Sequence, residues 1–263
     1  MQTAVNMTDY RNLSTRELLD QVERIGRDLP AGLIQTLLAR RIELRNELLE
    51  RFKESIDDEW EDDDDPRWYR SVHYGFLLIA YRERKALPIF ASLYIDADSY
   101  DTLLEWFEEH PAHFGPPAVP VFQDVLQRLQ ARPDREWHYG GALSISILNT
   151  IAIRFPETRP GIVSFLRSFL PPLNADGRIV LDDEKEIDEL WGSIVNALAD
   201  LRDRVSMPQV LAMFDADLID PMEIDRDNYL HELEQASSSP KPAPFDIYTI
   251  YPQHTHLDAT QDQ

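Results

Sequence analysis

The sequence contains no cysteine, which excludes disulfide bonds, thiolate-bound zinc and a cysteine nucleophile. It also lacks any run close to the roughly 20 apolar residues of a membrane-spanning helix. The first residues, 1–14, have no apolar segment of the kind found in signal peptides. We therefore expect a soluble, cytoplasmic protein.

Basic residues are scarce, because 26 Lys and Arg stand against 48 Asp and Glu in 263 residues, a formal net charge of −22. Residues 1–56 hold nine acidic and nine basic side chains, so the whole excess lies after residue 56. An acidic surface repels nucleic-acid phosphates and anionic lipid headgroups. We predict a basic protein as the partner, with no nucleic acid and no membrane bound, and leave the oligomeric state open.

Signature motifs of serine hydrolases, kinases, P-loop proteins, dinucleotide-binding enzymes and zinc proteases are missing. We expect no enzyme, no catalytic residue, no metal and no cofactor. His73 is the best single candidate for a buried acid or base, although a core histidine with satisfied nitrogens is the commoner role. His110 and His113 lack a third ligand and an orienting partner, so we interpret them as loop histidines rather than a metal site.

Helical signals dominate the rest of the chain, in which 43% of residues are hydrophobic. The central stretch is Arg67–Asp96, which predicts two helices joined by an elbow, with one apolar stripe on the first and Pro88 in the first turn of the second. Ser14 and Glu17 form a predicted capping box before another helix. Further helices are expected after Pro30, over 43–55, 98–109, 121–130, 137–155, 160–170 and 182–203, after Pro208, and from Asp220 to Leu233.

Three short segments are predicted to be non-helical or tightly packed. His110–Pro120 contains four prolines and is expected to be irregular. Asn174–Ile179 predicts a tight turn rather than a calcium loop, because Pro172 and Asp183 replace two required ligands. Gly140 and Gly141 are interpreted as sites of close helix packing, since no Gly-rich phosphate motif is complete.

We divide the chain into an N-terminal arm (1–13), a helical-repeat domain (14–235) and a Ser/Pro linker with an aromatic tail (236–263). The acidic loop over 57–65 is a solvated connector or a docking site for a basic partner or a cation. The tail alternates apolar residues over 245–251, which suits an extended segment. It packs on its own helices, is held out for a partner, or is disordered. The candidate partner-binding residues are Asp62, Asp63, Asp64, Asp65, Phe245, Tyr248 and Tyr251.

The elbow recurs along the chain. Ile79–Arg82 followed by Pro88 matches Ile151–Arg154 followed by Pro160, and Leu198–Arg202 followed by Pro208 is a third copy with one residue inserted. The spacings of 72 and 48 residues bracket one and two units of a helix-pair repeat of ~40–47 residues. We predict an all-α protein, an α-solenoid of antiparallel helix pairs.

Three motifs, Arg40–Leu44, Tyr81–Pro88 and Ala216–Pro221, carry a resemblance to a bacterial family of domains of unknown function, family 1186. The resemblance implies HEAT-like helical repeats from about Pro30 to Leu233, and it supplies no catalytic residues. Some members carry a cysteine-rich metal-binding tail, which this chain lacks.

These observations predict a non-enzymatic scaffold that binds a basic protein through an acidic surface. Residues 174–234 hold 17 acidic and five basic side chains and are the preferred face. The alternatives are an enzyme with an unrecognised carboxylate and histidine site, and an inhibitor whose acidic surface mimics nucleic acid.

Overall fold

The structure is a computed structural model that describes residues 10–56, 65–96, 102–132, 139–181, 190–235 and 243–251. Within these ranges the chain is helical, and the only β-type pairing is an isolated antiparallel bridge between Leu173 and Ile179. The predicted all-α class is confirmed. No helix in the described ranges has both the length and the apolar character needed to cross a bilayer.

The chain divides into two compact units. Unit 1 combines Met1–Ala86 with Pro244–Gln263, and unit 2 is Leu87–Ala243. The boundary falls inside the range 14–235 that the sequence predicts as one helical domain, between the two helices of the stretch 67–96. The C-terminal tail thus belongs with the N-terminal helices.

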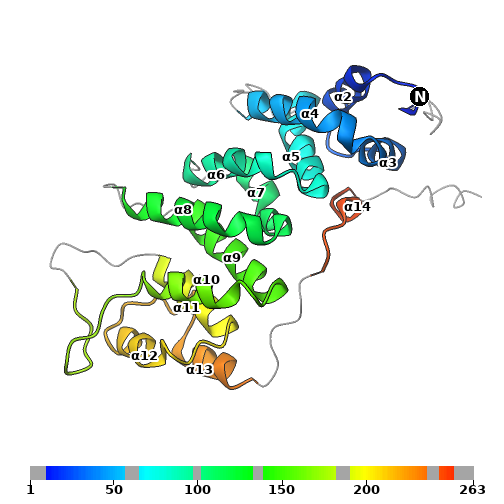
Figure 1. Ribbon diagram of the computed structural model, residues 1–263. Helices are drawn as coiled ribbons and strands as arrows, with labels where there is room; N and C mark the ends of the chain where they lie inside the picture. Colours follow the sequence, from blue (N-terminus) through cyan, green and yellow to red (C-terminus); the bar gives the residue numbers. More distant parts are fainter. Residues whose placement is uncertain are drawn as a thin grey trace, which may run out of the picture. The chain divides into compact units, whose positions relative to one another are not determined.

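Unit 1 begins with the predicted capping box. The Ser14 hydroxyl accepts a hydrogen bond from the Glu17 N–H at 3.3 Å, and the Glu17 carboxylate accepts one from the Ser14 N–H at 2.8 Å. The two bonds satisfy donors that a helix start leaves unpaired. The helical segments of this unit in the described residues are α2 (Thr15–Arg24), α3 (Ala31–Ala39), α4 (Arg41–Ser55), the 3-10 helix η1 (Pro66–Tyr69), α5 (Arg70–Tyr81), the 3-10 helix η2 (Arg84–Ala86) and α14 (Ile247–Ile250) (Figure 1).

Helix α5 is the centre of unit 1. Every residue from Ser71 to Ile79 is buried, and the helix contacts α2, α3, α4, η1 and α14. The prediction of a single apolar stripe is wrong for this helix, because neighbours cover all of its sides. Polar side chains on it must therefore find partners inside the protein.

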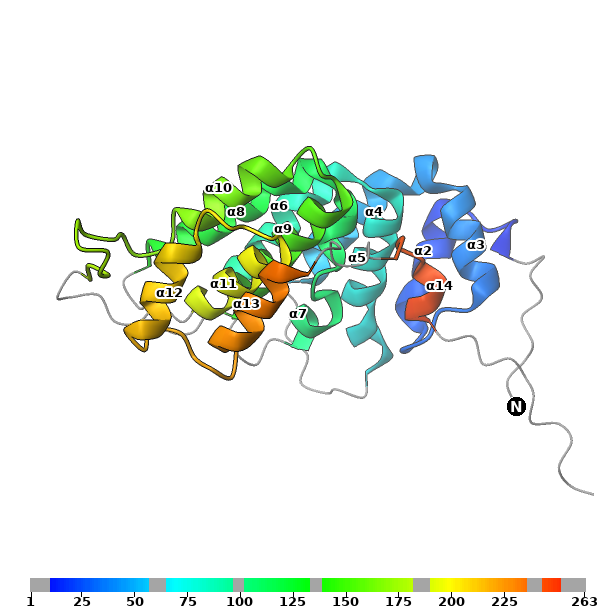
Figure 2. The same cartoon turned by 90° about the horizontal axis from the view of Figure 1, so that it is seen from below.

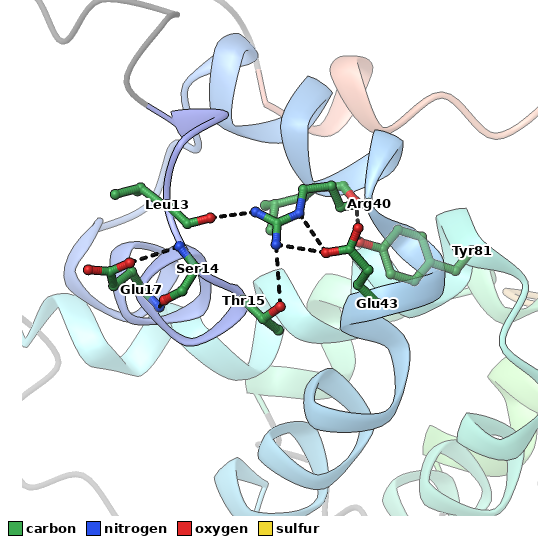
Figure 3. A network of polar contacts seen from close by, with 8 residues as sticks. Leu13, Ser14, Thr15, Glu17, Arg40, Glu43 and Tyr81 are labelled. Carbon is green, nitrogen blue, oxygen red and sulfur yellow. Dashed lines mark hydrogen bonds and ion pairs between the residues drawn. The ribbon is translucent and has the colours of Figure 1, made fainter.

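Two arginines connect the helices of unit 1. Arg40 donates to the Leu13 carbonyl at 2.6 Å and to the Glu43 carboxylate at 2.7 Å, which ties the start of α2 to the α3–α4 junction (Figure 3). Arg51 on α4 forms ion pairs with Asp20 at 3.0 Å and Glu23 at 2.8 Å, both on α2. These bonds fix the register between helices that apolar contacts alone leave less specific.

Unit 2 is built around α9. The helix is buried on several sides and contacts α6, α8, α10, α11 and η3. Its buried residues include Ile145, Leu148 and Ile151. The described helical segments of unit 2 are α6 (Leu87–Asp96), α7 (Thr102–Phe107), the 3-10 helices η3 (His110–Phe114) and η4 (Pro116–Ala118), α8 (Val119–Gln130), α9 (Tyr139–Arg154), α10 (Arg159–Arg167), α11 (Leu190–Asp200), α12 (Met207–Asp215) and α13 (Arg226–Glu234).

Close packing explains the glycine pair at the start of α9. A Cβ atom added at Gly140 would lie 2.0 Å from the Tyr94 carbonyl oxygen, and one at Gly141 would lie 3.0 Å from the Leu190 side chain. Only a residue without a side chain lets α9 approach α6 this closely. The packing interpretation of this pair is confirmed.

Two boundaries were predicted wrongly. His110–Pro120 is not irregular, because Pro111, Pro116 and Pro120 stand in the first turns of η3, η4 and α8, where a missing N–H costs little. The last helix of the repeat region starts at Arg226 rather than Asp220, because the Asp225 carboxylate caps it by accepting from the Asn228 N–H at 2.7 Å.

The predicted elbow has the same backbone geometry in two of its three copies. Arg82 after α5 and Arg202 after α11 both adopt left-handed conformations, with φ of 51° and 55°. In both copies, the N–H of the residue that follows the arginine donates to the carbonyl oxygen five residues before it. This is the 6→1 hydrogen bond of a Schellman motif. The middle copy differs, because the Phe155 N–H after Arg154 bonds to Ile151 as in an ordinary helix.

Candidate functional site

The described part of the C-terminal tail lies against α5 within unit 1 (Figures 1 and 2). Ile247 is 3% exposed and Tyr251 is 1% exposed, so these two side chains are its anchors. Phe245 stacks on Phe76 of α5, with ring centroids 6.3 Å apart. We call the surface of unit 1 that receives these side chains the tail seat, defined by Gly26, His73 and Phe76.

One turn of helix places the anchors. The Asp246 carboxylate accepts a hydrogen bond from the Tyr248 N–H at 3.0 Å and starts α14. Because Ile247 and Tyr251 are four positions apart, the turn puts them on the same side. Tyr248 points elsewhere and is 36% exposed. The prediction of an extended segment is therefore wrong over Ile247–Ile250. The interpretation that the tail packs on its own helices is confirmed for the described residues 243–251.

His73 is the polar centre of the tail seat. It is 0% exposed, and its Nδ1 lies 2.8 Å from the Tyr251 hydroxyl while its Nε2 lies 3.0 Å from the Gly26 carbonyl oxygen. A carbonyl oxygen only accepts, so Nε2 carries the proton and Nδ1 accepts from Tyr251. Both ring nitrogens are therefore occupied within the chain.

Burial keeps His73 neutral. It lowers the pKa of the imidazole from 6.5 to about 4, and this outweighs the opposite effects of the Gly26 and Ile25 carbonyls and of the Asp28 charge. Burial also raises the pKa of Tyr251 well above its ordinary value, so its hydroxyl remains a donor. The pair is a neutral hydrogen bond in an apolar setting, where leaving either partner unsatisfied is costly.

The acidic loop is only partly described. Asp62, Asp63 and Asp64 lie outside the described residues. Asp65 caps η1 by accepting from the Arg67 N–H at 2.9 Å, and it pairs with the Arg67 guanidinium at 2.6 Å. The side-chain bond with Arg67, followed by the backbone bond, lowers the pKa of Asp65. The structure thus gives Asp65 a local capping role.

The histidine pair joins η3 to α9. His110 and His113 stack with ring centroids 6.1 Å apart, and His113 contacts the Arg154 guanidinium. Burial lowers the pKa of His110. No group of three or more metal-binding side chains occurs among the described residues.

Asn174 forms the predicted turn, because its side-chain oxygen accepts two backbone N–H groups at 2.9 Å.

Exposed carboxylates follow one another along unit 2 from the end of α12 to the end of α13. Helix α13 packs against α11, and Figure 2 shows the course of this part of the chain. We call this run, residues 215–234, the acidic surface. Met222 lies within it and is 90% exposed. Of its seven exposed carboxylates, only Asp215 has an ion-pair partner, Arg226, among the residues that the structure describes. The seven are Asp215, Asp217, Asp220, Glu223, Asp225, Asp227 and Glu234.

Sequence reasoning found the acidic excess in this region but missed Met222. The exposure of Met222 could have been predicted from its position between Pro221 and the capping residue Asp225. A residue in so short a connection has few neighbours that cover it.

Comparison of the chain with models of protein families, with curated proteins and with solved structures finds no match in any of the three. The resemblance to family 1186 therefore stays a prediction.

Proposed function

We propose that this protein is a non-enzymatic helical-repeat scaffold that binds a basic protein through the acidic surface. The observation that carries the proposal is the run of seven exposed carboxylates over 215–234, of which one is ion-paired within the described residues. Like charges that are close in the sequence repel one another, and a cationic partner relieves that repulsion.

The acidic surface combines two kinds of contact. Its carboxylates select a basic partner and speed the encounter more than they tighten the complex. Met222, 90% exposed, offers an adaptable apolar contact in the middle of the charges. A basic segment that also carries an apolar side chain is the partner that fits both features.

The scaffold part of the proposal is supported by the contacts in unit 2. Helix α6 contacts α8 and α9, α9 contacts α11, and α11 contacts α13, so neighbours follow the order of the chain. The shared left-handed elbow after α5 and α11 is the second support. Both features are typical of α-solenoids, in which each helix pair packs mainly on the next pair.

The non-enzymatic part is supported by His73. As the best sequence candidate for an acid or base, it is fully buried and uses both ring nitrogens within the chain. A general acid or base needs an atom within hydrogen-bond reach of its substrate.

The proposal is tested with a lysine-rich peptide that has one central leucine, by fluorescence anisotropy at rising salt. We expect binding to weaken as salt rises, because exposed charges are screened beyond ~8 Å at physiological ionic strength. The triple variant Asp217→Asn/Glu223→Gln/Asp227→Asn keeps Asp220 and Asp225, whose carboxylates accept the backbone N–H groups of Met222 and Asn228. It should weaken binding about tenfold, since each exposed pair contributes ~0.2–1 kcal/mol.

The matched control is Glu50→Gln/Glu54→Gln/Glu157→Gln, which removes three exposed carboxylates elsewhere. Both triple variants change the net charge from −22 to −19, since each removes three negative charges. Equal losses in the two variants would mean that total charge and not the acidic surface attracts the peptide. Binding that ignores salt would contradict the proposal as well.

A further inference from the structure

The tail seat and the segment that it binds come from opposite ends of the chain. The seat residues Gly26, His73 and Phe76 lie in the N-terminal part of unit 1, and the bound segment of the tail begins after residue 243. Between α13, which belongs to unit 2, and the segment of the tail that starts at Pro244, the chain runs through Gln235, the seven residues 236–242 and Ala243. The tail therefore follows unit 2 along the chain and belongs to unit 1.

The seat recognises the tail by three side chains. Phe245 stacks on Phe76, Ile247 is buried, and the Tyr251 hydroxyl donates to His73 at 2.8 Å. The partners of these side chains are remote in sequence, because His73 and Tyr251 are separated by 178 positions. The chemistry of recognition is thus the same whether the tail is supplied by its own chain or by another copy.

We propose that the tail seat also takes residues 245–251 from a second copy of this chain, so that two chains exchange their C-terminal segments. Exchange of an identical element creates a dimer without any new complementary surface. The competing reaction is closure within one chain, whose effective concentration for a short linker is in the millimolar range. At ~100 μM chain, about one seat in ten is therefore filled by the other copy. The proposal is independent of the acidic surface.

The absence of native cysteine allows a direct test by cross-linking. A full-length chain with Phe76→Cys in the seat is mixed with a longer, tagged chain with Phe245→Cys in the tail, under oxidised glutathione. We expect a mixed disulfide dimer whose tryptic peptides join positions 76 and 245. The matched control is Tyr248→Cys, on the exposed side of the same segment, and it should give at least fivefold less mixed dimer.

The double variant Phe76→Cys/Phe245→Cys shows whether these two positions can be bridged at all, because it closes within one chain. If it closes while the mixed dimer forms no faster than with Tyr248→Cys, the tail stays in its own chain and the proposal is wrong.

A second measurement avoids any change in the buried seat. Unlabelled and nitrogen-15-labelled wild-type chains are mixed at rising concentration and examined by native mass spectrometry. We expect mixed dimers whose share rises with concentration and drops at least fivefold with Ile247→Ala/Tyr251→Ala in both chains. Only monomers up to ~1 mM, or dimers that the tail variant leaves unchanged, would overturn the proposal.

Discussion

Acidification should destabilise unit 1 because His73 is buried there as a neutral base. In the unfolded chain an imidazole binds a proton near its ordinary pKa, whereas burial lowers the pKa of His73 from 6.5 to about 4. Between these two values the unfolded state binds a proton that the folded state does not. Stability therefore falls as the pH drops from about 6.5 to about 4 and loses nothing more from this group at lower pH.

The size of the effect follows from the two pKa values. One pKa unit corresponds to about 1.4 kcal/mol, so the full loss from this histidine is about 3 kcal/mol. Proton binding at Nδ1 also removes the acceptor for the Tyr251 hydroxyl. Because Tyr251 is one of the two buried anchors, release of the tail from its seat should accompany the loss.

Carboxylates titrate in the same range, so the assay needs a variant that isolates His73. His73→Gln keeps a side-chain N–H that can donate to the Gly26 carbonyl, and it does not titrate. Urea unfolding of both proteins at pH 7, 6, 5 and 4.5 gives the difference in their stability, from which the carboxylates cancel. We expect the wild type to lose about 2 kcal/mol relative to the variant between pH 7 and pH 5.

The pKa itself is measured by following the carbon-bound ring protons of His73 by NMR as the pH is lowered. A midpoint near 4 agrees with the buried, doubly bonded ring. A midpoint near the ordinary value, or parallel pH profiles of the wild type and His73→Gln, would refute the reasoning.

Three substitutions and one control substitution test local features of the fold by thermal and urea unfolding. Gly140→Ala should destabilise by about 3 kcal/mol, because its Cβ would meet the backbone carbonyl of Tyr94 at 2.0 Å. The control is Gly161→Ala on α10, where an added Cβ meets open space. It should leave the stability of the protein unchanged or raise it by up to ~1 kcal/mol. Equal changes in stability for the two glycine variants would contradict the packing argument. Arg82→Gly should stabilise the protein by about 0.5–1 kcal/mol, because glycine adopts the left-handed conformation at this position, with φ of 51°, without strain. A loss of stability would contradict the left-handed geometry of the elbow. Tyr251→Phe should destabilise the protein by about 1–2 kcal/mol, because it leaves the buried Nδ1 of His73 without a hydrogen-bond donor. Unchanged stability would argue against that hydrogen bond.

Local signals in the sequence predicted helix starts well. The capping box of Ser14 and Glu17 and the first-turn position of Pro88 act within three or four residues, so neither depends on the rest of the fold. The start of α13 was misplaced for a related reason. Asp220 and Asp225 are both competent caps, and only the folded chain shows that Asp225 is the one that begins the helix.

The candidate site was less accessible from sequence. The acid excess over 174–234 was visible, but the exposure of Met222 and the scarcity of ion pairs depend on which side chains lie nearby. His73 was recognised as a candidate buried group, yet its partners were not. Alternation over 245–251 pointed to an extended segment, whereas the structure has one helical turn begun by Asp246.

The sequence by itself determined that this protein is helical, that many of its helices begin at caps and prolines, and that its charge is concentrated after residue 56. These properties arise from interactions within one or two turns of the chain and from composition. Only the tertiary structure decided that α5 and α9 are buried on several sides, that His73 is neutral, and that Tyr251 closes onto a histidine 178 positions away. Such contacts join segments whose sequences carry no mark of each other, because burial and hydrogen-bond partners are set by how the helices pack.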